Sequence, residues 1–182
     1  MRRLVGNGAR VNGANKDGIT PLMLASAAGR TETVRELVRL GADVNIKAHR
    51  YPGDTALYYA VLNNHPEVIK ILLDTGADPH TRMGAYSMLG IAASSSSVDM
   101  LSALLTSQKL DINVRDASGN TPDMLVMLSD APLEQKVASL KLLMGRGCDP
   151  TVQNSVGKNS CSIACEDKRP QILDVLHQCN CN

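Results

Sequence analysis

Cysteines are the residues of this chain whose type and spacing could do chemistry, and all five lie at or after position 148. Cys161 and Cys165 are four residues apart in a segment predicted to be helical, so their side chains share one face. A zinc site needs four Cys or His ligands, and the candidates are Cys161, Cys165, His177, Cys179 and Cys181.

An alternative interpretation needs no metal. Cys148, Cys161 and Cys165 could be buried thiols that fill small apolar positions, which leaves Cys179 and Cys181 as exposed thiols. An odd number of cysteines also favours free thiols in a reducing compartment. We prefer this interpretation and expect no metal and no cofactor, while a redox role of the last four cysteines stays open.

Little else in the sequence could support catalysis. The four histidines have no nucleophile, metalloprotease or phosphate-loop motif beside them. The glycine-rich run GNGARVNG (6–13) precedes a hairpin rather than a helix, so it lacks the geometry of a phosphate-binding loop. The serines at 94–97 could be phosphorylated, but we interpret them as a turn in which Ser97 caps the next helix. We therefore expect no enzymatic activity.

Composition narrows the class of protein. The 182 residues are 43% hydrophobic but include no Phe, no Trp and only four Tyr, which favours closely stacked helices. The net charge of +1 is too small for a nucleic-acid binder, and no run of 18 apolar residues predicts a membrane span. Residues 1–50 hold nine Lys and Arg against four Asp and Glu, which favours an acidic protein partner.

Two phrases recur along the chain with one period. The first is GARVN (8–12), GADVN (41–45), GADPH (76–80), KLDIN (109–113) and GCDPT (147–151), with spacings of 33, 35, 33 and 38 residues. The second begins at Thr20, Thr55, Ser87, Thr121 and Asn159, with spacings of 35, 32, 34 and 38 residues. Two independent phrases that share a period indicate a repeat protein.

Each repeat has the residues of two short helices. Thr20 is suited to cap a helix and Pro21 to begin it, while TETVRELVRL (31–40) has one apolar and one charged face. Neither helix is long enough to be stable alone, so each must bury its apolar face against a neighbouring repeat. The pattern resembles the ankyrin repeat family over the whole chain. The resemblance implies an all-α repeat solenoid of helix–turn–helix units with hairpin loops.

On this register the repeats span 15–49, 50–81, 82–115, 116–153 and 154–182, after a partial repeat or cap at 1–14. The fourth repeat has extra residues between its helices, and Pro132 could begin its second helix. The fifth is degenerate, because it has neither Thr nor Pro at its helix start. The partial first repeat leads us to expect that the chain is part of a longer protein.

The register also predicts the core. The family usually has His after Thr-Pro-Leu, and this chain has other residues there, so we do not expect the hydrogen bonds of that His. His65 falls in the turn between two helices, where the family has a framework residue. The side chains predicted to be buried are Leu22, Leu24, Leu37, Val38, Leu57, Tyr59, Leu72, Leu89, Leu104, Leu125 and Leu142.

The resemblance implies a protein–protein interaction module, a scaffold or adaptor, that presents hairpin tips and first helices to a partner protein or peptide as one concave face. Tyrosines mark the expected contact, because all four lie between residues 51 and 86 and Tyr is frequent at interface hot spots. The predicted binding residues are Tyr51, Tyr58, Leu62, Met83 and Tyr86, with the basic tips at Lys16, Lys47 and Arg50 as the other candidate site.

Two other functions stay open. The chain could be the regulatory or substrate-recruiting segment of a larger enzyme, such as a kinase or ubiquitin ligase, or a purely structural spacer. We expect a monomer in the cytoplasm, with the nucleus as the alternative location, and no binding to nucleic acid or membrane.

Overall fold

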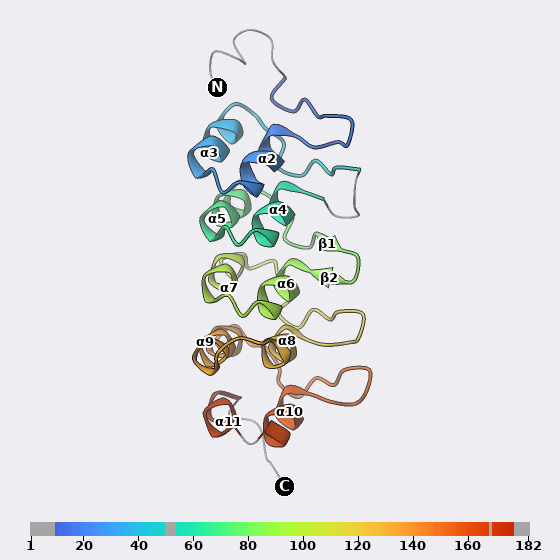
Figure 1. Cartoon of the computed structure of the whole chain (residues 1–182), viewed down its shortest axis with the longest axis vertical. Helices are drawn as coiled ribbons and strands as arrows, with labels where there is room; N and C mark the ends of the chain where they lie inside the picture. Colours follow the sequence, from blue (N-terminus) through green and yellow to red (C-terminus); the bar gives the residue numbers. More distant parts are fainter. Residues whose placement is uncertain (1–9, 50–53, 168, 177–182) are drawn as a thin grey trace. The chain divides into compact units, whose positions relative to one another are not determined.

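The computed structural model describes residues 10–49, 54–167 and 169–176 of the chain. They form short helices joined by turns and loops, in two compact units, residues 1–84 and 85–182. Within each unit the helices come in pairs, and the first helix of each pair lies beside the projecting loops (Figure 1). The predicted all-α repeat architecture is therefore confirmed.

The first unit has two helix pairs in its described part. They are α2 (Pro21–Ala27) with α3 (Thr31–Arg39), and α4 (Ala56–Leu62) with α5 (Pro66–Asp74). α2 packs on α4 and α3 packs on α5, so equivalent helices stack on each other. Each helix has only seven or nine residues, and this stacking supplies the burial that such short helices need. The unit ends with the two-residue strand β1 (Arg82–Met83).

The second unit begins with the strand β2 (Tyr86–Ser87) and has three helix pairs in its described part. They are α6 (Met88–Ser94) with α7 (Val98–Leu104), α8 (Pro122–Leu128) with α9 (Leu133–Met144), and α10 (Ser160–Asp167) with α11 (Pro170–Leu176). α8 packs between α6 and α10, and α9 packs between α7 and α11. None of the helices described in either unit is long and apolar enough to cross a membrane.

Local capping explains where the first helices begin. The Thr20 hydroxyl accepts a hydrogen bond from the backbone N–H of Met23 at 3.3 Å, and Thr55 and Ser87 cap α4 and α6 in the same way. Thr121 precedes α8 but makes no such bond, and its buried hydroxyl has no hydrogen-bond partner among the described residues. The start of α8 therefore lacks a stabilising contact that the equivalent helices have.

The buried face of α2 differs from the predicted one. Leu22 is buried as expected, but Met23 is buried as well, and Leu24 is 61% exposed. α2 packs against both α3 and α4. At about 100° per residue, Leu22, Met23, Ala25 and Ser26 form an arc of about 160° that meets both neighbours, and Leu24 falls opposite this arc. The predicted burial of Leu24 is therefore wrong.

Other core predictions divide in a similar way. Leu37, Leu57, Leu72, Leu89 and Leu104 are buried, as predicted. Four side chains predicted to be buried lie half-buried at the edge of the packed face, and they are Val38, Tyr59, Leu125 and Leu142. Tyr59 and Leu125 have the same place in α4 and α8 as Leu24 has in α2. The buried face of these first helices is rotated from the predicted one, and this rotation explains three of the five wrong predictions of burial.

Asparagine side chains connect successive loops within each unit. The Oδ1 atoms of Asn12, Asn45 and Asn113 each accept a hydrogen bond, at 2.9 Å, from a backbone N–H of the next loop. The donors are Asp43, Asp78 and Asp149. The Asn45 amide also donates to the Gly76 carbonyl oxygen at 3.0 Å, so one side chain satisfies both an N–H and a C=O of the following loop.

Candidate functional site

The loops that project beside the first helices end in rigid turns. Oδ1 of Asn15 accepts hydrogen bonds from the backbone N–H groups of Asp17 at 2.9 Å and Ile19 at 3.0 Å. Asp116 and Asn154 hold the equivalent turns of the second unit in the same way. Because each turn is held by its own residues, the side chains at its tip are in position before a partner binds.

The first unit exposes aliphatic side chains on its first helices and cations in its loops. Leu62 at the end of α4 is 52% exposed, and Leu24 of α2 is exposed as well. Lys16 and Lys47 lie exposed in the loops and make no ion pair with another described residue. This face therefore offers apolar contact area together with positive charge.

Tyr58 was predicted to contact a partner, and the structure contradicts this. Its side chain is only 5% exposed, while Tyr59, which was assigned to the core, is half-buried. The two rings pack edge to face with their centroids 5.3 Å apart. Tyr58 has the same place in α4 as the buried Met23 has in α2. Tyr58 is therefore the core residue and Tyr59 the more exposed one, the reverse of the prediction.

The other predicted site residues are only partly described. Leu62 and Tyr86 are exposed, Tyr86 to 49%. Tyr51, Arg50 and the side chain of Met83 lie outside the described residues. Leu62 belongs to the first unit and Tyr86 to the second, so the tyrosine patch that includes both of them stays a prediction.

A groove in the second unit was not predicted from the sequence. It has a volume of about 700 Å³ and lies between the turns that contain Ser118 and Val156 and the helices α8 and α10. Met127 and Ile163 line it as buried apolar residues, while Leu128 is 58% exposed and Val156 78% exposed. The groove therefore combines an apolar lining with apolar side chains that water still reaches.

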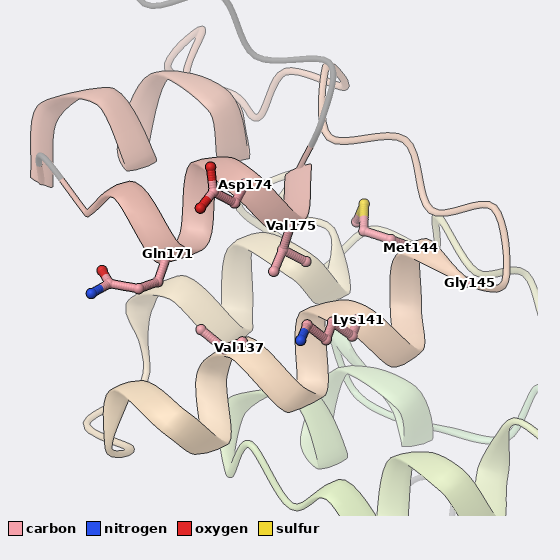
Figure 2. A pocket seen from close by; sticks show the side chains of 7 residues that line it. All are labelled: Val137, Lys141, Met144, Gly145, Gln171, Asp174 and Val175. Carbon is pink, nitrogen blue, oxygen red and sulfur yellow. The ribbon is translucent and has the colours of Figure 1, made fainter.

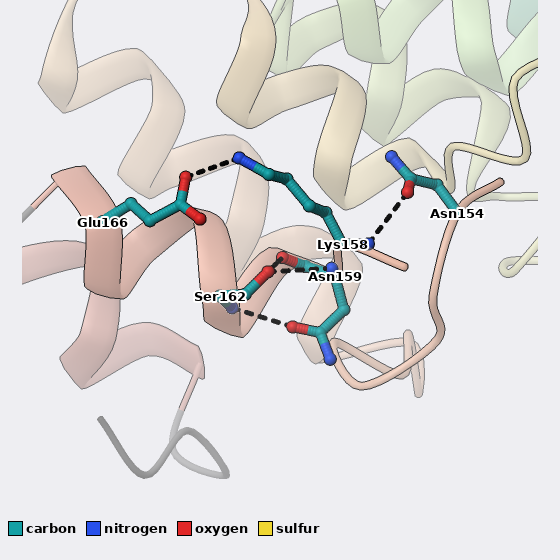
Figure 3. A network of polar contacts seen from close by, with 5 residues as sticks. All are labelled: Asn154, Lys158, Asn159, Ser162 and Glu166. Atoms are coloured by element: carbon teal, nitrogen blue, oxygen red, sulfur yellow. Dashed lines mark hydrogen bonds and ion pairs between the residues drawn. The ribbon is translucent and has the colours of Figure 1, made fainter. Parts of the chain in front are cut away.

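Polar contacts shape one rim of this groove (Figure 3). Nζ of Lys158 lies 2.7 Å from Oε2 of Glu166, and this ion pair connects the turn to α10. Asn159 caps α10, since its Oδ1 accepts from the Ser162 N–H at 2.8 Å while Oγ of Ser162 accepts from the Asn159 N–H at 3.0 Å. The degenerate fifth repeat thus begins its first helix with a reciprocal cap in place of Thr-Pro.

A second groove, of about 740 Å³, lies between α9 and α11. Figure 2 shows Val137, Lys141 and Met144 on α9, with Gln171, Asp174 and Val175 on α11. Val175 is buried, and Val137 and Met144 are half-buried. Of the described residues that line this groove, no apolar side chain is exposed, whereas Leu128 and Val156 of the other groove are, so we consider this groove the poorer protein-binding candidate.

A buried carboxyl group in the second unit was also missed. Asp123 of α8 is 0% exposed, and no N–H or O–H group of the described residues donates a hydrogen bond to its carboxylate, so the neighbouring Cys148 thiol is left as a weak donor. Cys148 is a buried free thiol, as predicted. Its pKa is raised above the ordinary value, first because burial disfavours the thiolate, then because the Asp123 carboxylate is close and accepts a hydrogen bond from the protonated thiol. Cys148 is therefore a poor nucleophile and a poor metal ligand.

The prediction of free thiols is wrong for Cys161 and Cys165, because each takes part in a disulfide bond. Both side chains are half-buried on α10, whereas the sequence placed them in the core. Cys179 and Cys181 lie outside the described residues. Among the described residues, no three His, Cys, Asp or Glu side chains gather as a metal site.

His65 has a structural role, as the sequence indicated. Its Nε2 lies 3.1 Å from the carbonyl oxygen of Ala27, to which the ring donates a hydrogen bond. Gly29 lies against this ring with φ at +63°, and a Cβ atom there would be 2.6 Å from the imidazole. His65 therefore fastens one repeat of the first unit to the next, and the glycine makes room for it.

Comparison with known proteins agrees with this architecture. Residues 1–83 match the family model for ankyrin repeats (three copies). Together with the stacked helix pairs of both units, this match identifies the chain as an ankyrin repeat protein.

The chain is similar in sequence to several curated proteins. The chain is 28% identical over 178 residues to the ANK repeat-containing protein nipk-1 of Caenorhabditis elegans, which covers 88% of the chain and 29% of the relative. It is 25% identical over 172 residues to the putative ankyrin repeat protein YahD of Escherichia coli (strain K12). This match covers 93% of the chain and 84% of YahD. It is 30% identical over 152 residues to the mitochondrial disaggregase of Bos taurus. This match covers 84% of the chain and 22% of the disaggregase. The chain thus spans less than a third of the length of the first curated relatives it matches.

Proposed function

We propose that this chain binds a partner protein or peptide on the face made by its loop tips and first helices. Ankyrin repeats are protein–protein interaction modules, and the exposure of Leu24 and Leu62 on this face is the observation that carries the proposal. Aliphatic side chains that no internal packing covers favour contact with another protein. The rigid turns beside them lower the entropic cost of binding.

The positive charge of the first unit favours an acidic partner there. Residues 1–84 contain eleven Lys and Arg against eight Asp and Glu. Lys16 and Lys47 can meet an incoming carboxylate without first breaking an ion pair to a described residue. Complementary charge of this kind mainly accelerates association and depends on salt.

The test is a selection of random peptides displayed on phage against the purified 182-residue chain. We expect the recovered peptides to bind the Leu24→Ser, Leu62→Ser double variant at least about tenfold more weakly, because their apolar contact is lost. Leu133→Ser is the matched control, since Leu133 is an exposed leucine at the start of α9. Recovered peptides that bind the double variant as tightly as the wild type would move the site off this face. Failure to recover any peptide would count against the binding function itself.

A second candidate function is that of a recruiting segment within a larger enzyme. The observation in its favour is that the chain spans only 22% of the mitochondrial disaggregase that it resembles. The complete transcript tests this candidate, because a catalytic domain encoded beyond either end would support it. A transcript that encodes these repeats alone would reject it.

A further inference from the structure

We propose that the groove between α8, α10 and the turns at Ser118 and Val156 binds a basic segment of a partner protein, with one large apolar side chain of that segment as the anchor. This inference rests on the proposed binding function, and it assigns a different partner chemistry to the second unit. The site is defined by its apolar lining residues Met127, Leu128, Val156 and Ile163, and by the carboxylates Glu166 and Asp167 on its rim.

The apolar residues of the groove are arranged to take an anchor. Met127 and Ile163 are buried, whereas Leu128 and Val156 remain 58% and 78% exposed. A side chain placed between them would cover apolar surface that now faces water, which is how central anchors stabilise interfaces. The volume of about 700 Å³ admits one large side chain together with the backbone that carries it.

Comparison with equivalent positions shows that the fold does not require these two apolar residues. Val156 is at a turn position where the corresponding turns have Asp17 and Ser118. Leu128 is at a helix position where the neighbouring repeats of its unit have Ser94 and Glu166. Single exposed apolar residues are common, but two that line one groove indicate a binding surface.

The turn holds Val156 in a fixed position. Oδ1 of Asn154 accepts hydrogen bonds from the backbone N–H groups of Val156 at 3.1 Å and Lys158 at 3.0 Å. The Asn154 amide donates to Oδ1 of Asn120 at 2.8 Å, which ties this turn to the previous one. The Lys158 ion pair to Glu166 then fixes the turn to α10. A preorganised wall of this kind loses little entropy when a partner binds.

Charge selects a basic partner. Residues 85–182 contain ten Asp and Glu against eight Lys and Arg, the opposite balance to residues 1–84. On the rim, Glu166 pairs with Lys158, and the Glu166 side chain is still more than half exposed in this ion pair. Asp167 lies 3.5 Å from the Arg169 guanidinium, also at the surface. A Lys or Arg beside the anchor can share the Glu166 carboxylate, whose side chain stays exposed beside Lys158, whereas an acidic segment would be repelled by the net negative charge of residues 85–182.

The experiment uses the same phage selection and sorts its peptides by their response to the Leu128→Ser, Val156→Ser double variant. Both positions are exposed, so this variant keeps the fold, which circular dichroism verifies. We expect a class of peptides that bind it at least about tenfold more weakly and that carry Lys or Arg next to a Leu, Ile, Met or Phe. Synthetic peptides of this class should bind the Glu166→Gln, Asp167→Asn variant more weakly at low salt and nearly normally at high salt. Leu133→Ser should leave their affinity unchanged.

Three results would overturn the proposal. Peptides that depend only on Leu24 and Leu62 would leave the proposed function intact and remove the groove from it. Peptides that depend on Leu128 but are enriched in Asp and Glu would refute the charge assignment. Self-association of the chain that Leu128→Ser abolishes, measured by light scattering, would assign the groove to a second copy.

Discussion

Leu57 in the first unit and Asp123 in the second hold the same place in their repeats, two residues after the threonine that precedes a first helix. Both side chains are fully buried. In the first unit this place is always aliphatic in the described helices, with Leu22 as the other example. In the second unit it holds Leu89, then Asp123, then Cys161. Two units of one architecture thus place different chemistry at the same depth.

The replacement of an aliphatic residue by Asp123 affects the stability of the second unit as well as its charge. A buried polar group without a hydrogen-bond partner costs about 1–3 kcal/mol of unfolding free energy. Asp123 brings a carboxyl whose nearby donor is only the weak Cys148 thiol into the middle of the second unit, and Thr121 adds a buried hydroxyl without a described partner at the start of the same helix. The first unit also buries a hydroxyl without a described partner, at Ser26, but a buried carboxyl costs more than a hydroxyl, so the larger penalty falls on the second unit.

The largest expected effect comes from replacing Leu57 of the first unit by Asp, the residue that the second unit has at the equivalent position 123. Leu57→Asp buries a carboxylate among aliphatic neighbours, and we expect it to destabilise the first unit by about 4 kcal/mol or more. Circular dichroism should show loss of helix and a lower unfolding temperature. Leu62→Asp is the control, because Leu62 is on the same helix but exposed, and it should change stability by less than about 0.5 kcal/mol. A Leu57→Asp chain that melts like the wild type would mean that this position is not buried.

The reverse exchange should stabilise the second unit. Asp123→Leu removes a buried carboxyl that only the Cys148 thiol can satisfy and restores the side chain found at Leu89, and we expect a gain of about 1–3 kcal/mol in urea unfolding. Hydrogen exchange should slow in α8 and α10, which pack together. Asp123→Asn keeps a polar group and should give a smaller gain. If Asp123→Leu lowered stability, the carboxyl would have to make a stabilising contact and the comparison of the two units would fail.

The smallest effect is a pH dependence confined to the second unit. The ordinary thiol pKa is 9.0, and burial beside Asp123 raises the pKa of Cys148. Above about pH 9 the unfolded thiol ionises while the folded thiol keeps its proton, so the stability it contributes is lost as pH rises. Between about pH 8 and pH 9.5, the wild type should lose somewhat less than about 1 kcal/mol relative to Cys148→Ala in urea unfolding. Parallel pH curves for the two proteins would show that the thiol is not protected.

Much of the fold could be predicted because its signals are local. The helix starts at Thr20, Thr55 and Ser87 rest on a cap made to a residue three positions away, and each unit repeats this pattern. The buried face was harder to predict. Its direction depends on two neighbouring helices at once, and an error of one position exchanged the roles of Tyr58 and Tyr59.

The groove could not be predicted from periodicity, because its walls come from two turns and two helices of successive repeats. One signal was available: Val156 is an aliphatic residue at a turn tip where the turns before Thr20 and Thr121 have Asp17 and Ser118. Asp123 was visible too, as a charged residue in an aliphatic column. The overall composition does not mark Val156 or Asp123 as unusual. They stand out only when the residues at equivalent positions of the repeats are compared.

The asparagine bridges between loops have a consequence for how such chains can grow. The amides of Asn12, Asn45 and Asn113 each satisfy backbone groups of the loop that follows, whatever the side chains of that loop are. A whole repeat could therefore be duplicated or deleted during evolution without a new set of matching contacts at the junction. Chain length becomes a quantity that selection can change in steps of one repeat, while the spacing of the loops stays constant.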